Sequence, residues 1–440
     1  MKFWLHTYGC QMNVRDSEAV EAMLLAAGHE KSANEAEADL VIVNSCTVRQ
    51  KAENKALGKV GYLLSQKHAA VGLMGCVVSR LGEEAVKKQF PRLSFCVRPG
   101  HLKDIPFVSA SSDPLAAHPF LLPSTSTSIS PSTFNLQPST SFAFVTVMTG
   151  CDNCCSYCIV PKTRGHEYSR PAADIIAEVE CLARHGVKEV TLLGQSVLKW
   201  KDESSGHVTF PMLLRRLNEI EGLERIRFTS AHPKGCTDEL VAAYRDCPKV
   251  CCHLHLPVQS GSDRVLKEMG RRYTRAEYLE AVKKLRAFDP EFSITTDVIV
   301  GYPGETEADF EATRSLMEEA GFDNSFIFKY SPRPGTRSAA LADDVPVEEK
   351  ERRDQVLLAD QEARGLKRNA ALVGTVREVL VEGPSKRNAA RWSGRDSGNR
   401  IVVWDIPADS SAPGATIGSV IKVKIIEAHA QILVGETISL

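Results

Sequence analysis

The sequence predicts an α/β protein built from an N-terminal doubly wound parallel sheet, a central partial (β/α)6 barrel and a small C-terminal β-barrel. Three observations support this fold class. Apolar strands alternate with helices over residues 1–106, the alternation returns over 142–331, and only short strands follow residue 372. We expect domains at 1–106, 142–368 and 369–440, with a linker at 107–141.

Composition and charge narrow the class of protein. The chain has 440 residues and is 43% hydrophobic, which suits two to four globular domains. Its net charge of −1 means that any basic surface for nucleic acid must be local. The start of the chain lacks a signal-peptide pattern, and no apolar run is long enough to cross a bilayer. Thirteen cysteines, an odd number in a chain of this size, are more typical of a protein in the reducing cytoplasm than of a disulfide framework. We expect no association with a membrane.

The first part of the chain is expected to form a βαβαβ unit. Strands are predicted at Lys2–Tyr8, Asp39–Val43 and Ala70–Met74, and helices at Asn13–Ala27 and Gln50–Ser65. Asp16 and Ser17 are candidate caps of the first helix. Cys10, Cys46 and Cys76 each follow the carboxyl end of a strand, where ligands gather in open α/β sheets. They predict a three-thiolate site, although buried free cysteines also serve as small hydrophobes.

A second set of thiols lies at the start of the central part. Cys151, Cys155 and Cys158 form a C-x3-C-x2-C run after the predicted strand Phe142–Val147. Thiolates suit iron, and three of them leave one iron of a [4Fe–4S] cube open to an outside ligand. Cys154 creates a competing C-x2-C-x3-C spacing, and zinc is the alternative metal. Zinc usually takes four ligands in pairs, and no partner pair is obvious.

The central part alternates six strands with helices. The predicted strands are Phe142–Val147, Glu189–Leu193, Arg225–Thr229, His253–Leu256, Ser293–Val300 and Ser325–Tyr330. The predicted helices are Ala173–His185, Phe210–Ile220, Thr237–Arg245, Thr274–Phe288 and Thr306–Ala320. Polar, glycine-rich loops follow the strands, where barrel enzymes carry their chemistry. Gln195, Ser230, Gln259 and Gly301 in these loops are our candidates for a pocket that binds a small polar cofactor.

The connecting segments and the tail differ in composition from the two α/β parts. The linker is rich in Ser, Thr and Pro and cannot bury a core, whereas Pro346–Arg368 reads as a charged helix. Tail strands are predicted at Gly374–Val381, Asn399–Trp404, Ser419–Ala428 and Gln431–Val434. Between the first two lies a basic strip with Trp392, which contains Lys386, Arg387, Arg391, Arg395 and Arg400. The strip is expected either to bind an RNA backbone, through Lys386, Arg387, Arg391 and Arg395, or to be an ordinary solvated loop.

These motifs resemble those of the methylthiotransferase family of radical S-adenosylmethionine (SAM) enzymes over nearly the full chain. The matching stretches are Tyr8–Asn13, Asn44–Arg49, Gly75-Cys76, the run from Cys151 to Cys158, Thr163-Arg164-Gly165, Ser169-Arg170-Pro171, Leu254–Ser262 and Asp297–Glu305. The tail is similar to a TRAM domain, a small β-barrel associated with RNA binding. Ser196 departs from the family pattern, which usually has Asn after the Gly-Gln pair.

The resemblance implies two [4Fe–4S] clusters and SAM as cofactors. It assigns Cys10, Cys46 and Cys76 to a sulfur-bearing cluster, and the run from Cys151 to Cys158 to the cluster that cleaves SAM. The stretch Arg227–Pro233 and the tail are most similar to the branch that adds a 2-methylthio group to C2 of N6-isopentenyladenosine beside the tRNA anticodon. That branch implies tRNA, an electron donor such as flavodoxin or ferredoxin, and a sulfur source as partners of a monomeric chain.

Other functions remain as alternatives. Sister branches methylthiolate threonylcarbamoyl-adenosine in tRNA or an aspartate of a small-subunit ribosomal protein. From a different class, the chain would be a non-catalytic iron–sulfur electron carrier or an RNA-binding protein. A carrier needs four ligands for each cluster and no substrate pocket. The ring of polar loops therefore favours an enzyme.

Overall fold

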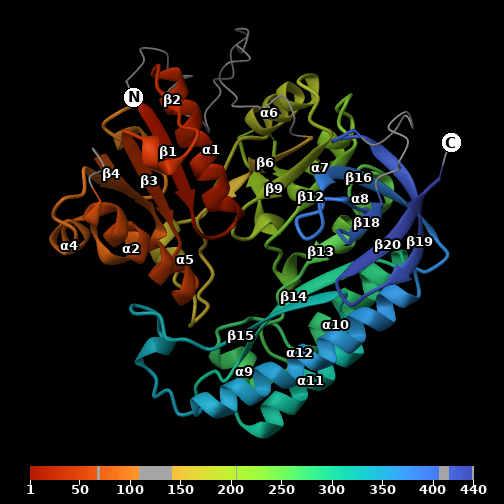
Figure 1. Ribbon diagram of the computed structural model, residues 1–440. Helices are drawn as coiled ribbons and strands as arrows, with labels where there is room; N and C mark the ends of the chain where they lie inside the picture. Colours follow the sequence, from red (N-terminus) through yellow and green to blue (C-terminus); the bar gives the residue numbers. More distant parts are fainter. Residues whose placement is uncertain (67–69, 109–140, 205, 406–415, 439–440) are drawn as a thin grey trace.

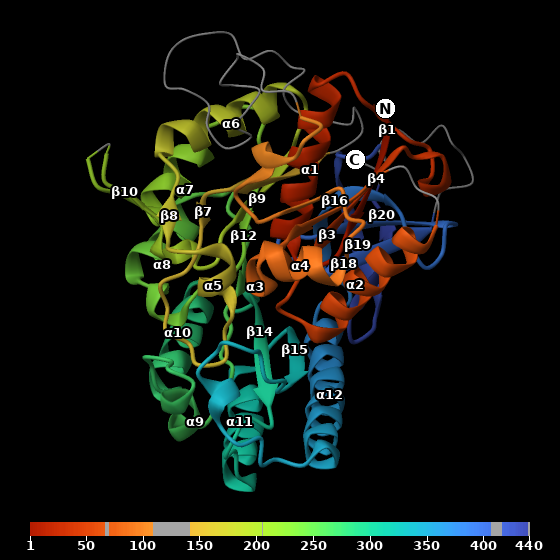
Figure 2. The ribbon, with the colours of Figure 1, turned by 90° about the vertical axis from the view of Figure 1, so that its left-hand side faces the viewer.

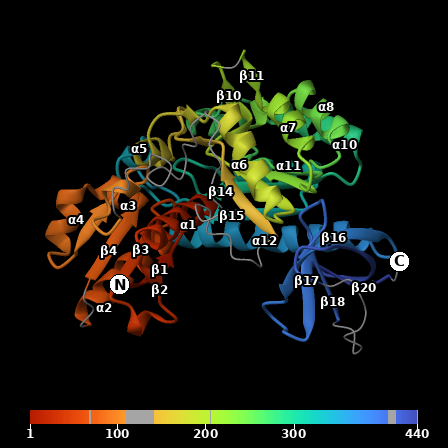
Figure 3. The same cartoon turned by 90° about the horizontal axis from the view of Figure 1, so that it is seen from above.

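The computed structural model describes residues 1–66, 70–108, 141–204, 206–405 and 416–438. Most of the expected linker at 107–141 lies outside these residues. Figure 1 shows the three expected architectures, an N-terminal sheet, a central barrel and a C-terminal barrel. Seen from above, the N-terminal sheet and the C-terminal barrel lie at opposite ends, and α12 (Val347–Ala370) leads into the latter (Figure 3). The α/β fold class with a closed terminal barrel is therefore confirmed.

The N-terminal part is a parallel sheet with helices on both faces. Its strands, in the order β2-β1-β3-β4-β5, are Glu30–Lys31, Lys2–Thr7, Leu40–Ser45, Ala70–Gly75 and Phe95–Val97. Its helices are α1 (Gln11–Ala26), α2 (Gln50–Ser65), α3 (Cys76–Leu81) and α4 (Glu83–Gln89). Apolar residues of α1 pack on one face of the sheet, and those of α2 and α4 pack on the other. Both faces are thus buried, as a parallel sheet requires.

The start of α1 differs from the sequence prediction. Asp16 and Ser17 do not cap this helix, because it begins at Gln11 and Cys10 occupies the N-cap position. Both residues are buried inside the helix. Ser17 accepts a hydrogen bond from Thr7 in β1, while Asp16 pairs with an arginine of the central part. The polar spacing that resembled a cap is instead a buried polar face that contacts other elements.

The central part is an open barrel made of two three-stranded parallel sheets. Its strands are β6 (Phe142–Thr146), β9 (Glu189–Leu193), β12 (Arg225–Phe228), β13 (His253–His255), β14 (Ser293–Val300) and β15 (Asn324–Lys329). β9 lies between β6 and β12, and β14 lies between β13 and β15. A parallel bridge pairs Ile226 of β12 with Val250, three residues before β13. The six expected strands therefore form one curved wall.

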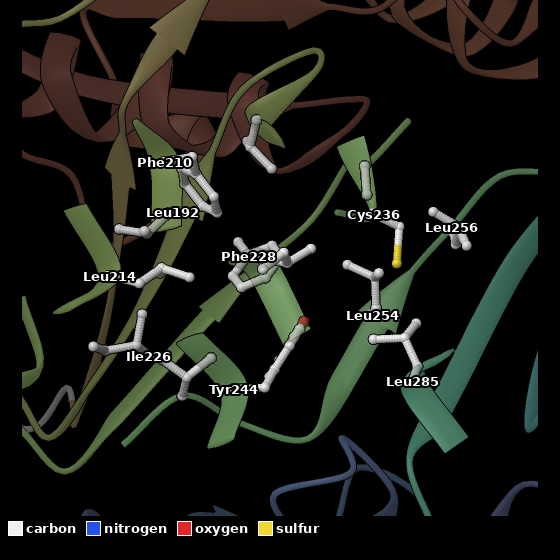
Figure 4. Packing of buried hydrophobic residues seen from close by; sticks show 14 of the residues in the cluster. Leu192, Phe210, Leu214, Ile226, Phe228, Cys236, Tyr244, Leu254, Leu256 and Leu285 are labelled. Carbon is white, nitrogen blue, oxygen red and sulfur yellow. The ribbon is translucent and has the colours of Figure 1, made fainter. Parts of the chain in front are cut away.

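Helices cover the outer face of this wall. They are α6 (Ala172–Arg184), α7 (Phe210–Asn218), α8 (Asp238–Asp246), α9 (Asp263–Glu268), α10 (Arg275–Phe288) and α11 (Glu307–Ala320), whereas α5 (Val160–Arg164) lies beside α3 of the N-terminal part. Capping boxes at Thr274 and Thr306 fix the starts of α10 and α11. Figure 4 shows the core between strands and helices, where Phe228 and Tyr244 pack closely among leucines. This packed layer leaves the inner strand faces and the loops at the strand ends available for function.

The tail is a closed five-stranded barrel. Its strands, in the order β16-β17-β18-β20-β19, are Val376–Pro384, Arg391–Arg395, Ile401–Asp405, Ile432–Thr437 and Val420–Ala428. The sequence prediction missed β17, whose residues were assigned to a basic loop. Its composition of Arg, Ser and Gly is weak strand signal, and pairing with β18, where Trp392 faces Trp404, supplies the strand.

Buried arginines fasten this barrel to the central part. Arg225 donates to the Arg395 carbonyl at 2.6 Å, and Arg227 donates to the Asp396 carbonyl at 2.7 Å. Arg400 pairs with Asp323 at 2.8 Å. Arg400 therefore belongs to the domain interface and not to an exposed basic strip. Its partner Asp323 lies 77 residues away in the chain, so local sequence could not reveal this contact.

Candidate active site

The barrel cysteine site, which comprises Cys151, Cys155 and Cys158, lies in the loop between β7 (Met148–Thr149) and α5. Gly150 begins the loop with φ +76°, and a Cβ there would lie 1.8 Å from the His166 carbonyl oxygen. Only glycine fits this close, left-handed turn. Burial raises the pKa of the Cys158 thiol to about 12, the Val160 N–H opposes this shift, and the other two thiols raise it further. Bound cations would remove this penalty by stabilising the thiolates.

Two distant segments hold the cysteine loop in place. The Ser156 N–H donates to the Met269 carbonyl at 2.9 Å, and the Ser338 N–H donates to the Ser156 carbonyl at 2.9 Å. Arg271 donates to Cys155 Sγ at 3.5 Å, and Arg337 donates to the Cys154 carbonyl. The Cys154 thiol is exposed, unlike the other three cysteines of the run. The structure therefore sets Cys154 apart from its neighbours.

The N-terminal cysteine site comprises Cys10, Cys46 and Cys76. Cys10 lies at the start of α1, Cys46 follows β3 and Cys76 begins α3, so the three residues share one edge of the sheet. A Cβ on Gly9 would lie 2.7 Å from the Cys46 Cβ, which shows how closely these loops approach. Burial raises the pKa of the Cys76 thiol to about 11, Arg164 lowers it, and the Cys46 and Cys10 thiols raise it. The three thiols are thus close enough to affect one another.

Arg164 connects the two cysteine sites. It ends α5, six positions after Cys158, and α5 packs beside α3 (Figure 2). Its side chain is only 6% exposed and lies 2.8 Å from Asp16 of α1. Although burial opposes its charge, Asp16 and the Cys76 thiol raise the pKa of the Arg164 guanidinium. One short helix therefore extends from the barrel cysteines to the N-terminal cysteines.

Two further contacts fix the same interface. Glu178 of α6 is buried between Arg170 of its own part, at 2.7 Å, and Arg15 of α1, at 3.0 Å. Arg333, after β15, donates to Gln50 of α2 at 2.6 Å. Because a buried charge without a partner is costly, the Glu178 carboxylate depends on its two arginine partners, one of which comes from α1.

The spacing of the thiols suits a cluster better than a single metal ion. All thirteen cysteines are free. Within the described residues, no three His, Cys, Asp or Glu side chains converge on the position of a single metal ion. A [4Fe–4S] cube accepts wider spacing, because each of its cysteines binds a different iron. Two sets of three mutually close thiols, each with an arginine beside it, therefore fit two such cubes. The assignment of the six cysteines as ligands remains a prediction.

The four pocket candidates all follow strands of the wall. Ser230 has φ 62° and Gln259 has φ 71°, a conformation that is uncommon without glycine and often marks a functional loop. Gln195 Oε1 is buried and has no hydrogen-bond partner among the described residues, and the same holds for Ser196 Oγ beside it. A buried acceptor and hydroxyl without partners suit a polar ligand. Gly301 is already engaged, since its N–H donates to Glu305 at 2.5 Å.

The four basic residues expected to bind RNA have different surroundings. Lys386 and Arg387 are exposed between β16 and β17, and neither forms an ion pair within the described chain. Arg391 pairs with Asp405 at 2.7 Å, and Arg395 pairs with Glu382 at 3.0 Å. Lys386 and Arg387 are therefore the better candidates for phosphate contacts, and the role of all four stays a prediction.

Comparison with known proteins agrees with this organisation. Residues 145–317 match the radical SAM superfamily, residues 2–97 match an uncharacterized protein family known as UPF0004, and residues 370–438 match the TRAM domain. The radical SAM methyltransferase TsrM from Kitasatospora setae, solved with cobalamin and a [4Fe–4S] cluster, has a similar fold, with a TM-score of 0.51 at 14% identity over 74% of this chain and 70% of that one. The match over residues 145–317, in a part of the chain with this fold, assigns the central part to the radical SAM class.

Curated relatives make the assignment more specific. Proteins named tRNA-2-methylthio-N(6)-dimethylallyladenosine synthase are 43% identical in Opitutus terrae, 42% in Akkermansia muciniphila and 44% in Geobacter sulfurreducens. The alignments cover 98–99% of this chain and 96–98% of those proteins. The chain belongs to this family of radical SAM methylthiotransferases. Within the described residues, no helix is long and apolar enough to span a membrane.

Proposed function

We propose that this protein transfers a methylthio group to C2 of N6-isopentenyladenosine beside the tRNA anticodon. The name of its full-length relatives supports the substrate, since dimethylallyl and isopentenyl denote the same N6 group. The observation that carries the proposal is the pairing of two three-cysteine sites through α5 and Arg164, because the reaction needs both a radical source and a sulfur carrier. The domains proposed for these roles are 1–106, 142–368 and 369–440.

The chemistry explains why two cofactors are needed. C2 of adenine carries an unactivated C–H bond that no side-chain base can ionise at a useful rate. When bound, the two [4Fe–4S] clusters and SAM supply the radical, the methyl group and the site that carries sulfur. Cys151, Cys155 and Cys158 would hold the cluster that binds and cleaves SAM, and Cys10, Cys46 and Cys76 the cluster that carries sulfur.

The remaining residues of the site bind and orient. Arg271 directs positive charge at Cys155, while Arg164 directs it at Cys76 and compensates the charge of the thiolates. Gln195, Ser230 and Gln259 offer polar groups to SAM at the carboxyl edge of the barrel wall. Lys386 and Arg387 would contact tRNA phosphates. The proposal includes two further partners, a small electron donor such as flavodoxin or ferredoxin and a sulfur source. It also includes a cytoplasmic location and a monomeric state.

Mass spectrometry of nucleosides tests the proposed reaction. The reconstituted protein is incubated without oxygen with SAM, sulfide, a reductant and tRNA that contains N6-isopentenyladenosine. We expect 2-methylthio-N6-isopentenyladenosine together with 5′-deoxyadenosine. Product only from tRNA with threonylcarbamoyl-adenosine, or only on a ribosomal-protein aspartate, would assign the chain to a sister branch. Absence of 5′-deoxyadenosine would favour a non-catalytic carrier.

A further inference from the structure

The inner face of the sheet formed by β13, β14 and β15 carries side chains that the roles described so far do not use. Along β14, Ile294, Val298 and Val300 point outward into the helix-covered core. The alternate residues Thr295, Asp297 and Ile299 face the other way and remain partly exposed, as the period of a strand requires. This inner face is therefore accessible to a ligand.

Three side chains on this face lie together. The imidazole of His255, in β13, lies 3.4 Å from the Asp297 carboxylate through Nε2 and 3.0 Å from the Thr295 hydroxyl through Nδ1. Phe326, in β15, is the direct strand partner of Asp297, and its ring meets that of His255 edge to face at 5.8 Å. Phe326 is 46% exposed, which is unusual for a large aromatic on an inward-facing strand position.

On one side, this group adjoins the barrel cysteine site. Arg271, which donates to Cys155, also donates to the Pro257 carbonyl at 3.1 Å, two residues after His255. The Asp297 carbonyl accepts from the N–H of Gln259, one of the pocket candidates, at 2.8 Å.

On the other side, the group adjoins the N-terminal cysteine site. Two residues beyond Phe326, the ring of Phe328 stacks with Arg49 at 4.9 Å. Arg49 lies close enough to the Cys46 thiol to lower its pKa, against the larger effect of burial, which raises it. Residues next to His255, Asp297 and Phe326 thus contact the surroundings of both cysteine sites.

We propose that Phe326, Asp297 and His255 bind the target base itself, an N6-alkylated adenine turned out of its RNA. The exposed Phe326 ring stacks on the base, and RNA-binding proteins commonly hold unstacked bases on aromatic rings. The Asp297 carboxylate accepts the single N–H that alkylation leaves on N6. His255 orients that carboxylate from the side away from the base. This inference rests on the proposed function, since it names where that substrate is read.

Binding measurements with matched RNA hairpins test the site directly. Anticodon stem-loops with N6-isopentenyladenosine or plain adenosine are titrated into the full-length protein, and the ratio of their dissociation constants is determined by fluorescence anisotropy. We expect Phe326→Ala to weaken binding of the alkylated hairpin about tenfold, in line with the loss of one stacked base. Asp297→Asn should weaken binding of both hairpins, because plain adenine also offers an N6–H to the carboxylate. The KM of the alkylated hairpin should rise in parallel.

Phe142→Ala is the matched control, because Phe142 is a similarly exposed phenylalanine (41%) on another strand of the same wall. It should leave both dissociation constants and the KM unchanged. Unchanged dissociation constants in both Phe326→Ala and Asp297→Asn would overturn the inference. So would an equal loss of 5′-deoxyadenosine formation from SAM without RNA, which would assign the face to the adenine of SAM. If the wild-type protein made no methylthio product from the alkylated hairpin, the proposed function itself would fail.

Discussion

The turn at Gly150 provides a graded test of how the barrel cysteines are positioned. Gly150 and Gly165 both have a positive φ, at +76° and +78°, and they lie at opposite ends of the segment that contains the cysteines. Alanine at such a sparsely populated positive φ costs about 1–3 kcal/mol. At Gly165 the added methyl group meets nothing within 4 Å, so this cost is the whole effect. At Gly150 the methyl group would overlap the His166 carbonyl oxygen at 1.8 Å.

The overlap at Gly150 adds an overpacking cost of about 1–3 kcal/mol. If the loop alone bears that cost, Gly150→Ala should retain its cluster roughly five- to 150-fold less well than Gly165→Ala. Both variants are made in a background where Cys10, Cys46 and Cys76 are Ala, reconstituted without oxygen and challenged with a chelator. Each should start from about four irons. Equal iron retention by the two variants would refute the argument that this turn positions the cysteines.

Three other predictions follow from the electrostatics. Replacing Lys386 and Arg387 with Ala should reduce the slope of log binding constant against log salt concentration for tRNA by about 1.4–1.8. Replacing Lys87 and Lys88, at the end of α4, with Ala is the control and should leave this slope unchanged. Arg164→Gln should lower the reduction potential of the N-terminal cluster, because a nearby positive charge is lost. Arg164→Lys keeps the charge and should have a smaller effect. Redox titration followed by electron paramagnetic resonance measures both potentials. Burial, aided by Arg271, lowers the pKa of His232 from 6.5 to about 3. The free energy of unfolding, measured with denaturant, should therefore decrease as pH falls from 6.5 toward 3, and this decrease should be smaller in His232→Gln.

The elements that local periodicity determines could be predicted from the sequence. Strand alternation placed Cys10, Cys46 and Cys76 near three strand ends, since each strand and its following turn are encoded within a few residues. The barrel wall was predictable for the same reason. β17 was not, because pairing with β18 creates that strand from weakly strand-forming residues.

The residues that surround the cysteines could not be predicted from local sequence patterns. Arg271 lies 116 positions from Cys155, and Arg164 is joined to Asp16 only when two domains dock. Asp16 shows the opposite error, since a polar residue near a helix start resembles a cap until its distant partner is known. Helix caps, pockets and domain interfaces use the same types of polar residue, so only the folded structure shows which role a given residue has.

Two single-cysteine variants test the central claim, which is that the two cysteine sites divide the work. Cys46→Ala and Cys155→Ala are each assayed for 5′-deoxyadenosine and for 2-methylthio nucleoside in the same reaction with SAM, reductant, sulfide and tRNA. Cys46→Ala should still form 5′-deoxyadenosine but no methylthio product, because the sulfur carrier loses a ligand. Cys155→Ala should form neither. Normal methylthio product from Cys46→Ala would contradict the account and reduce the N-terminal cysteines to packing residues.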